Sequence, residues 1–153
     1  MKHKILSLLA ASLSVLFLTS CGTDPEIMTF MQDLEDFCTA VSDLNESINH
    51  IDAEADNAAA LALDYLDRLD SQFQDFAALD FPEEFDYLEP LADEAGEYMK
   101  EAVESYHQAY ANDDYDADTA AYARENSARA FKRIQIILQV MRGEDPAEAS
   151  DGE

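Results

Sequence analysis

The residues best suited to chemistry form an acidic segment in the second half of the 153-residue chain. Four acids have the spacing of ligand positions 1, 3, 5 and 12 in an EF-hand calcium loop, and these are Asp114, Asp116, Asp118 and Glu125. Carboxylate oxygens are ligands that Ca²⁺ prefers. The sixth position, which needs a glycine, is Thr119, and the alanine-rich sequence from Ala117 favours a helix. We therefore interpret the aspartates as the N-cap and first turn of a helix, with a weak calcium site as the alternative.

A second candidate for metal chemistry is the pair Glu104 and His107, which matches the Glu-x-x-His element of di-iron helical bundles. Such a centre needs a second element of this kind and two further glutamates, all pointing into the core. The apolar spacing around Ala102 and Tyr106 instead places Glu104 in solvent and His107 at the edge of the core. His50 is expected on the outer face of its own helix. We predict surface histidines, and neither a metal nor another cofactor.

Other catalytic signals are weak in this sequence. It contains no nucleophile motif, glycine-rich phosphate loop or cysteine cluster. A catalytic triad is assembled in space, so its absence from the sequence pattern lowers the expectation of an enzyme without excluding one. We predict that the protein is not an enzyme.

The N-terminus carries a different kind of chemistry. Lys2 and Lys4 precede an apolar stretch at residues 5–18, in the order of a secretory leader and shorter than the roughly 20 residues of a membrane span. The stretch ends in a tetrad that resembles the lipobox of bacterial lipoproteins, Leu18-Thr19-Ser20-Cys21. The resemblance implies cleavage before Cys21 and a diacylglyceryl thioether on its sulfur, with acyl chains such as palmitate. The mature protein would then be extracytoplasmic and lipid-anchored to the cell membrane.

The chain is strongly acidic, with 34 acidic and 9 basic residues and a formal net charge of −25. Loss of Lys2 and Lys4 with the leader would make the mature protein more negative by two charges. This charge opposes binding to nucleic acid or to anionic lipid headgroups, and it attracts cations or basic partners. Disorder is not expected over most of the chain, because 48% of the residues are hydrophobic and they recur periodically.

Apolar residues at alternating intervals of three and four predict four amphipathic helices, at about residues 24–51, 54–79, 83–111 and 116–142. Asp24 and Pro25 supply an N-cap and a first-turn proline, and Gly143 is expected just after the last helix. Pro82 is expected to start the third helix, while Pro90 indicates a later start or a kink. No glycine or proline separates the first two helices, so one continuous helix is an alternative.

The expected helices bury one stripe each. The first stripe is Ile27, Phe30, Leu34, Phe37, Val41, Leu44, Ile48 and Ile51. The second is Ala55, Ala59, Ala62, Leu66, Leu69, Phe73 and Phe76. The third is Leu88, Ala92, Ala95, Met99, Ala102, Tyr106 and Ala109. The fourth is Ala120, Ala123, Ser127, Ala130, Phe131, Ile134, Ile137, Leu138 and Met141.

Short connections between such helices predict an all-α protein, an antiparallel up-down-up-down four-helix bundle at residues 21–143. A signal peptide would precede it at residues 1–20, and a disordered acidic tail would follow at residues 144–153. The fourth helix is locally basic, and packing beside acidic neighbours would relieve their repulsion; an exposed basic face for a partner is the alternative. Cys38 flanks the first stripe, so we interpret it as a small buried hydrophobic residue, with an intermolecular disulfide as the alternative.

This topology would bring the first and third connections together at the end of the bundle away from the membrane. The resulting tip would gather His50, Tyr106, His107, Tyr110 and Tyr115 as candidate ligand or partner contacts. Tyrosine is enriched at binding hot spots. Tyrosines that flank a core with their hydroxyls in water are the alternative.

Three segments of the mature chain look like small uncharacterised helical lipoproteins of Gram-positive gut bacteria: residues 81–85, 91–95 and 133–138. This similarity carries no function over. We therefore predict a lipid-anchored interaction or scaffold module, attached to the membrane through Cys21, with an unknown protein or cationic partner. The alternative is an extracytoplasmic sensor or binding protein for a cation or small ligand at the acidic tip.

Overall fold

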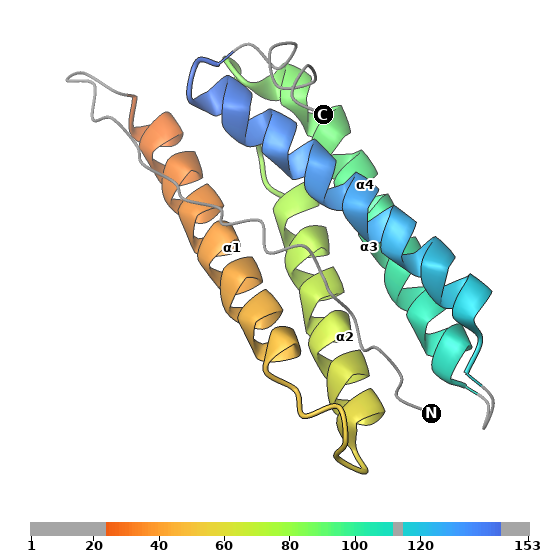
Figure 1. Ribbon diagram of the computed structural model, residues 1–153. Coiled ribbons are helices and arrows are strands. Elements are labelled where there is room, and N and C mark those ends of the chain that lie inside the picture. Colours follow the sequence, from red (N-terminus) through yellow and green to blue (C-terminus); the bar gives the residue numbers. More distant parts are fainter. Residues whose placement is uncertain (1–23, 112–114, 145–153) are drawn as a thin grey trace.

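The computed structural model describes residues 24–111 and 115–144, which fold into helices (Figure 1). The α-helices in these ranges are α1 (Pro25–Asn49), α2 (Ala58–Ala77), α3 (Glu89–Tyr110) and α4 (Ala117–Met141), and a 3₁₀ turn, η1 (Asp86–Leu88), precedes α3. No strand occurs in the described part of the chain. The all-α prediction and the four expected helices are confirmed. The expected leader and lipobox, and the tail beyond Glu144, lie outside the described residues.

The ends of α1 and α4 are closed by the residues expected to close them. The Asp24 carboxylate accepts a hydrogen bond from the Glu26 backbone N–H at 3.0 Å, as an N-cap does. After the last turn of α4, Gly143 has a φ of +74°, which only glycine adopts at little cost. Its N–H donates to the Val140 carbonyl at 2.8 Å, and the Glu144 N–H donates to the Gln139 carbonyl at 2.9 Å. This is the Schellman arrangement, and it ends α4.

The connection between α1 and α2 corrects two expectations. One continuous helix is wrong, because α1 ends at Asn49 and α2 begins only at Ala58. The Asp52 carboxylate accepts from the Glu54 backbone N–H at 3.0 Å, a local turn that competes with a helix start. In the first turn of α2, Ala58 is buried and Ala59 is exposed, so the predicted stripe is wrong there and correct from Ala62 onward.

The start of α3 also differs from the sequence expectation. Pro82 opens a turn, not a helix: the Phe85 N–H donates to the Pro82 carbonyl at 2.7 Å, and the 3₁₀ turn follows. The physical reason is Pro90, which has no N–H to donate and would clash inside a helix that began at residue 83. A start at Glu89 places Pro90 in the first turn, where a proline is tolerated.

The core is built from one face of every helix. In Figure 1, α1 lies beside α2, and α3 beside α4, and α2 also packs against α3. The α3–α4 interface is the most extensive, because small buried residues line it: Ala92, Ala95, Ala102, Ala109, Ala120, Ala123 and Ala130. The α1 side is filled by aromatic rings, Phe37 stacking on Phe76 with centroids 4.5 Å apart.

The predicted stripes of α1, α3 and α4 are buried or partly buried throughout. Cys38 is buried and is a free thiol, and burial raises its pKa to about 11. Its interpretation as a small buried hydrophobic residue is confirmed. Within the described ranges, none of the helices combines the length and the apolar character that a membrane span requires.

Candidate functional site

The acidic segment with calcium-loop spacing is the start of α4. Asp116 is the N-cap: its carboxylate accepts from the backbone N–H groups of Asp118 and Thr119 at 3.0 and 3.1 Å, and from the Thr119 hydroxyl at 2.7 Å. These bonds, those from Thr119 above all, lower the pKa of Asp116. Glu125 lies within α4 and pairs with Arg129 at 2.5 Å. The interpretation of Asp116 and Asp118 as cap and first-turn acids is confirmed; Asp114 lies outside the described residues.

The metal-ligating residue types do not converge elsewhere in the fold. Among the described residues, no group of three or more His, Cys, Asp or Glu side chains could hold a metal ion. Glu104 is exposed, as expected for a residue on the outer face of α3. His107 is also exposed, and its Nε2 lies 2.6 Å from an oxygen of Asp67 on α2. His50 is exposed, and its Nδ1 lies 2.7 Å from the backbone oxygen of Glu46.

The candidate tip is only partly accessible. Tyr106 has no exposed surface, so it cannot contact a partner in this fold, and its inclusion among the tip contacts is corrected. Burial raises the pKa of Tyr106 to about 12, against the opposing effects of Arg124 and of Ser127 beside it. In the described part of the chain, neither the Tyr106 nor the Ser127 hydroxyl makes a hydrogen bond of ordinary geometry.

Two of the tip residues do lie together. The rings of Tyr110 and Tyr115 are tilted against each other, with centroids 5.1 Å apart, and both are half-buried. Burial, followed by the neighbouring Tyr115, raises the pKa of Tyr110. Both rings also act electrostatically on Tyr106, so they lie in its neighbourhood. His107, in contrast, contacts α2.

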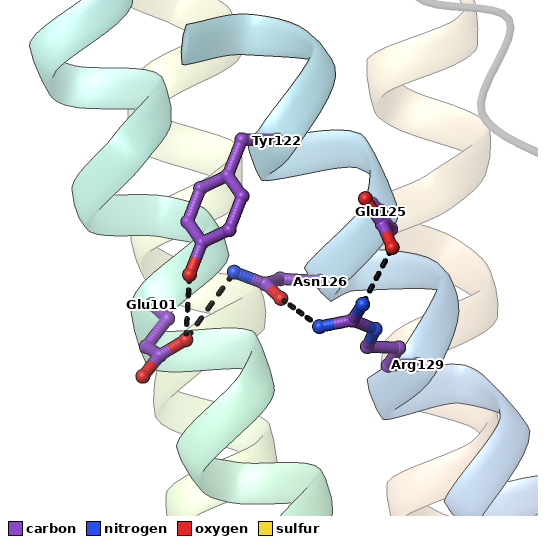
Figure 2. Close-up of polar contacts among 5 residues, drawn as sticks. All are labelled: Glu101, Tyr122, Glu125, Asn126 and Arg129. Atoms are coloured by element: carbon purple, nitrogen blue, oxygen red, sulfur yellow. Dashed lines mark hydrogen bonds and ion pairs between the residues drawn. The ribbon is translucent and has the colours of Figure 1, made fainter.

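A polar network along α3 and α4, centred on one buried side chain, was missed by the sequence reasoning (Figure 2). Asn126 is completely buried; its side-chain N–H donates to Glu101 Oε2 at 3.3 Å, and its Oδ1 accepts from Arg129 at 3.3 Å. The Tyr122 hydroxyl donates to the same oxygen of Glu101 at 3.4 Å. The sequence did contain one indication of this network, because Asn126 directly precedes Ser127, which belongs to the predicted buried stripe of small residues. The network aligns α3 with α4 and uses their polar groups internally.

Two basic residues of α4, Arg129 and Arg133, contact α3. Arg133 Nε lies 2.5 Å from an oxygen of Glu94, and the guanidinium groups of Arg129 and Arg133 lie 5.7 and 5.5 Å from the centroid of the Tyr98 ring. Such contacts combine charge pairing with cation–π attraction. The Arg133–Glu94 pair agrees with the expectation that basic residues of α4 offset the charge of the acidic helix beside them, while Arg124 and Lys132 are exposed.

The surface of α1 and α2 is hollowed along the line where the two helices meet. Two hollows of about 340 and 350 Å³ lie there, and they share Ala40 and Gln72. We call the pair the α1–α2 furrow. Its apolar lining residues are Phe37, Ala40, Leu44, Phe76 and Leu79. Its acidic lining residues are Asp33, Asp36, Asp43 and Asp75.

The electrostatics of this furrow follow from the sequence of its two helices. α1 contains no lysine or arginine, and α2 contains a single one, Arg68, at one end of the furrow. The Arg68 guanidinium lies 5.6 Å from the centroid of the Tyr65 ring. Within the described residues, no ion pair involves the four lining aspartates. The furrow is therefore mainly acidic. Nearly buried rings form the floor of one hollow, and the other hollow is lined mostly by polar residues, among them Ser47, Arg68 and Ser71.

Comparison with known proteins adds no relative from which a function could be carried over. No protein-family model matches the chain, and no curated protein and no solved structure matches it.

Proposed function

We propose that this protein is a lipid-anchored, extracytoplasmic interaction or scaffold module that binds a basic protein partner and is not an enzyme. The observation that carries the proposal is the division of charge between the two halves of the fold. Arginines of α4 contact Glu94, Glu125 and Tyr98 within the fold. The furrow between α1 and α2, in contrast, presents aspartates without basic counterparts along most of its length. A surface of one sign attracts partners of the opposite sign.

The helices in this proposal run antiparallel, up-down-up-down. Turns within the connections at residues 50–57 and 78–88, together with the packing of α1 on α2 and of α2 on α3, support this topology. Lipidated Cys21 would lie only four positions before Pro25, the first residue of α1. The acidic surface would then stand close to the membrane, where partners that share the membrane meet it.

Two features of the sequence support the membrane attachment. The tetrad ending in Cys21 resembles a lipobox, and the apolar stretch before it has the length of a leader. Two or three acyl chains give stable membrane attachment, where one chain is marginal.

The proposal is tested by salt-dependent binding to cell-envelope proteins separated by charge. The purified full chain is immobilised, and an unrelated protein of similar acidity serves as the control surface. We expect selective retention of one or a few basic proteins by the chain, with release as screening shortens the Debye length to about 8 Å. Equal retention on the control surface would reduce the interaction to non-specific charge and would overturn the proposed function.

A further inference from the structure

The α1–α2 furrow has a shape and a charge pattern that define one kind of occupant. We infer that it is a docking groove for a basic amphipathic helix of a protein partner. This inference rests on the proposed function and adds the site and the partner's secondary structure. It is carried by the length of the furrow, its lining, and the arrangement of acids on its two walls.

The length of the furrow fits a helix. Along α1 its lining runs from Asp33 to Ser47, which is roughly 21 Å at a rise of about 1.5 Å per residue. The same length holds about four turns of a partner helix. The two hollows join at Ala40 and Gln72. Because Ala40 is small, it leaves space for a side chain of the partner at this junction.

One of the two hollows has an apolar floor. Phe37 and Phe76 stack beneath it, 5% and 2% exposed, and partly buried Leu79 borders them. A helix that lays its apolar face into a groove uses residues spaced by three and four positions. Apolar side chains of the partner would therefore contact mainly Leu79 and Ala40 in this hollow.

The acids stand on both walls of the groove. Asp33 and Asp36 belong to α1, and Asp75 belongs to α2 on the other side of the Phe37–Phe76 stack. A partner would thus place lysines or arginines on both flanks of its apolar stripe. At the opposite end, Arg68 faces the same hollow as Asp43. This difference between the ends favours one direction of the bound helix, with its basic residues toward Asp33, Asp36 and Asp75.

A small cation fits this arrangement less well than a helix does. A metal ion needs several oxygens around one point, and the described residues offer no such cluster. The aspartates are instead distributed over the length of the furrow. Their spacing suits repeated charge contacts along a helix of several turns.

The probe for this inference is a synthetic 14-residue helical peptide of leucine and lysine, with the leucines on one face. It carries a fluorophore and a photoreactive leucine, and it is titrated into the full chain in nonionic detergent at low salt. Micelle binding is the same for every variant, so differences between variants report the protein. Irradiation and mass spectrometry then locate the cross-links, which we expect on α1 and α2 around Ala40 and Gln72.

Matched variants separate the groove from general acidity. Asp33→Asn/Asp36→Asn/Asp75→Asn removes three charges from the groove, and Asp93→Asn/Glu97→Gln/Glu104→Gln removes three exposed charges from α3. We expect the groove variant to raise Kd about tenfold and the α3 variant to change it less than about twofold. Removal of surface acids from so negative a chain is not expected to prevent folding, and melting curves check this.

A steric variant and a second peptide complete the test. Ala40→Trp fills the junction of the two hollows and should weaken binding, while the same peptide with glutamate in place of lysine should not bind. If both triple variants weaken binding equally, or if cross-links spread over α3 and α4, the assignment of the furrow as a docking groove is wrong. The proposal of an interaction module for a basic partner is not affected by this result. If the lysine peptide binds no better than it binds an unrelated acidic protein, both proposals fail.

Discussion

At the residue scale, buried polar side chains of this fold differ in how far they are hydrogen-bonded. Buried Asn126 bonds through both its Nδ2 and its Oδ1, to Glu101 and Arg129 at the exposed edge of α3 and α4. Tyr106 is the opposite case, because its ring is buried and its hydroxyl makes no hydrogen bond of ordinary geometry among the described residues. A buried hydroxyl without a partner keeps its full desolvation cost.

This difference predicts the effect of Tyr106→Phe. The substitution keeps the ring and removes a hydroxyl that interacts only weakly with Ser127, so we expect the free energy of unfolding to rise by up to about 1 kcal/mol. Urea unfolding of the variant and the parent chain measures it. A loss of stability would show that the hydroxyl is bonded in solution, to Ser127 or to a water molecule.

The cap of α4 predicts a pH dependence. The pKa of Asp116 is lowered from 3.8 by hydrogen bonds in the fold, chiefly from Thr119. A lowered pKa in the folded state stabilises the fold above the unfolded pKa, and this contribution is lost as the pH falls through the folded value. Asp116→Ala should therefore lower the melting temperature near neutral pH, and the difference should disappear below the lowered pKa.

Glu104→Ala, on the exposed face of α3, is the control for this effect. It should leave the melting temperature nearly unchanged over the same pH range. If Asp116→Ala and Glu104→Ala showed the same pH profile, the stabilising role of the cap would be refuted.

At the element scale, each helix is fixed by the stripe that it buries. α1 packs chiefly on α2, so its place depends on the contacts of rings such as Phe37 with Phe73 and Phe76. The three-and-four spacing was enough to predict these stripes. It was not enough to predict where α2 and α3 begin, because local turns set these starts. The Asp52 carboxylate accepts a hydrogen bond from the Glu54 N–H, and Pro90 is tolerated only in the first turn of α3.

The candidate site was less predictable than the helices. Spacing within one helix does not show which residues of another helix lie opposite. The pairing of His107 with Asp67, 40 positions away, and the furrow shared by Asp36 and Asp75 therefore appear only once the helices are packed. The charge pairing of α4 was predictable, because the basic residues concentrate in one helix.

The register of α1 is tested by two substitutions on opposite faces. Phe37→Ala removes a buried ring and should lower the free energy of unfolding by about 3–5 kcal/mol. Glu46→Ala changes an exposed side chain and should alter it by less than about 0.5 kcal/mol. Both are measured by urea unfolding. Comparable losses from the two would contradict the register.

At the scale of the whole molecule, charge dominates the behaviour. A formal net charge of −25 repels itself within the compact state, and the α4 arginines offset this repulsion only locally. The same imbalance is the basis for the basic partner that we propose. Stability and recognition should therefore both respond to salt, in opposite directions.

Added salt should raise the melting temperature, because screening to a Debye length of about 8 Å at 0.15 M weakens the repulsion between carboxylates. Calcium should add little beyond its ionic strength. Saturable stabilisation at low calcium, abolished by Asp114→Asn/Asp118→Asn with the Asp116 cap left intact, would instead establish a calcium site. Differential scanning fluorimetry against sodium and calcium chloride distinguishes these results.

The proposed function depends most on the protein being held outside the cell by lipid, because the partner that we propose belongs to the cell envelope. Mass spectrometry of the N-terminal peptide from the membrane fraction tests this directly. We predict a chain that begins at Cys21 and carries a diacylglyceryl group, and loss of this species in Cys21→Ser. A chain that retains residues 1–20 with an unmodified Cys21, or a processed and lipid-labelled Cys21→Ser protein, would contradict the account.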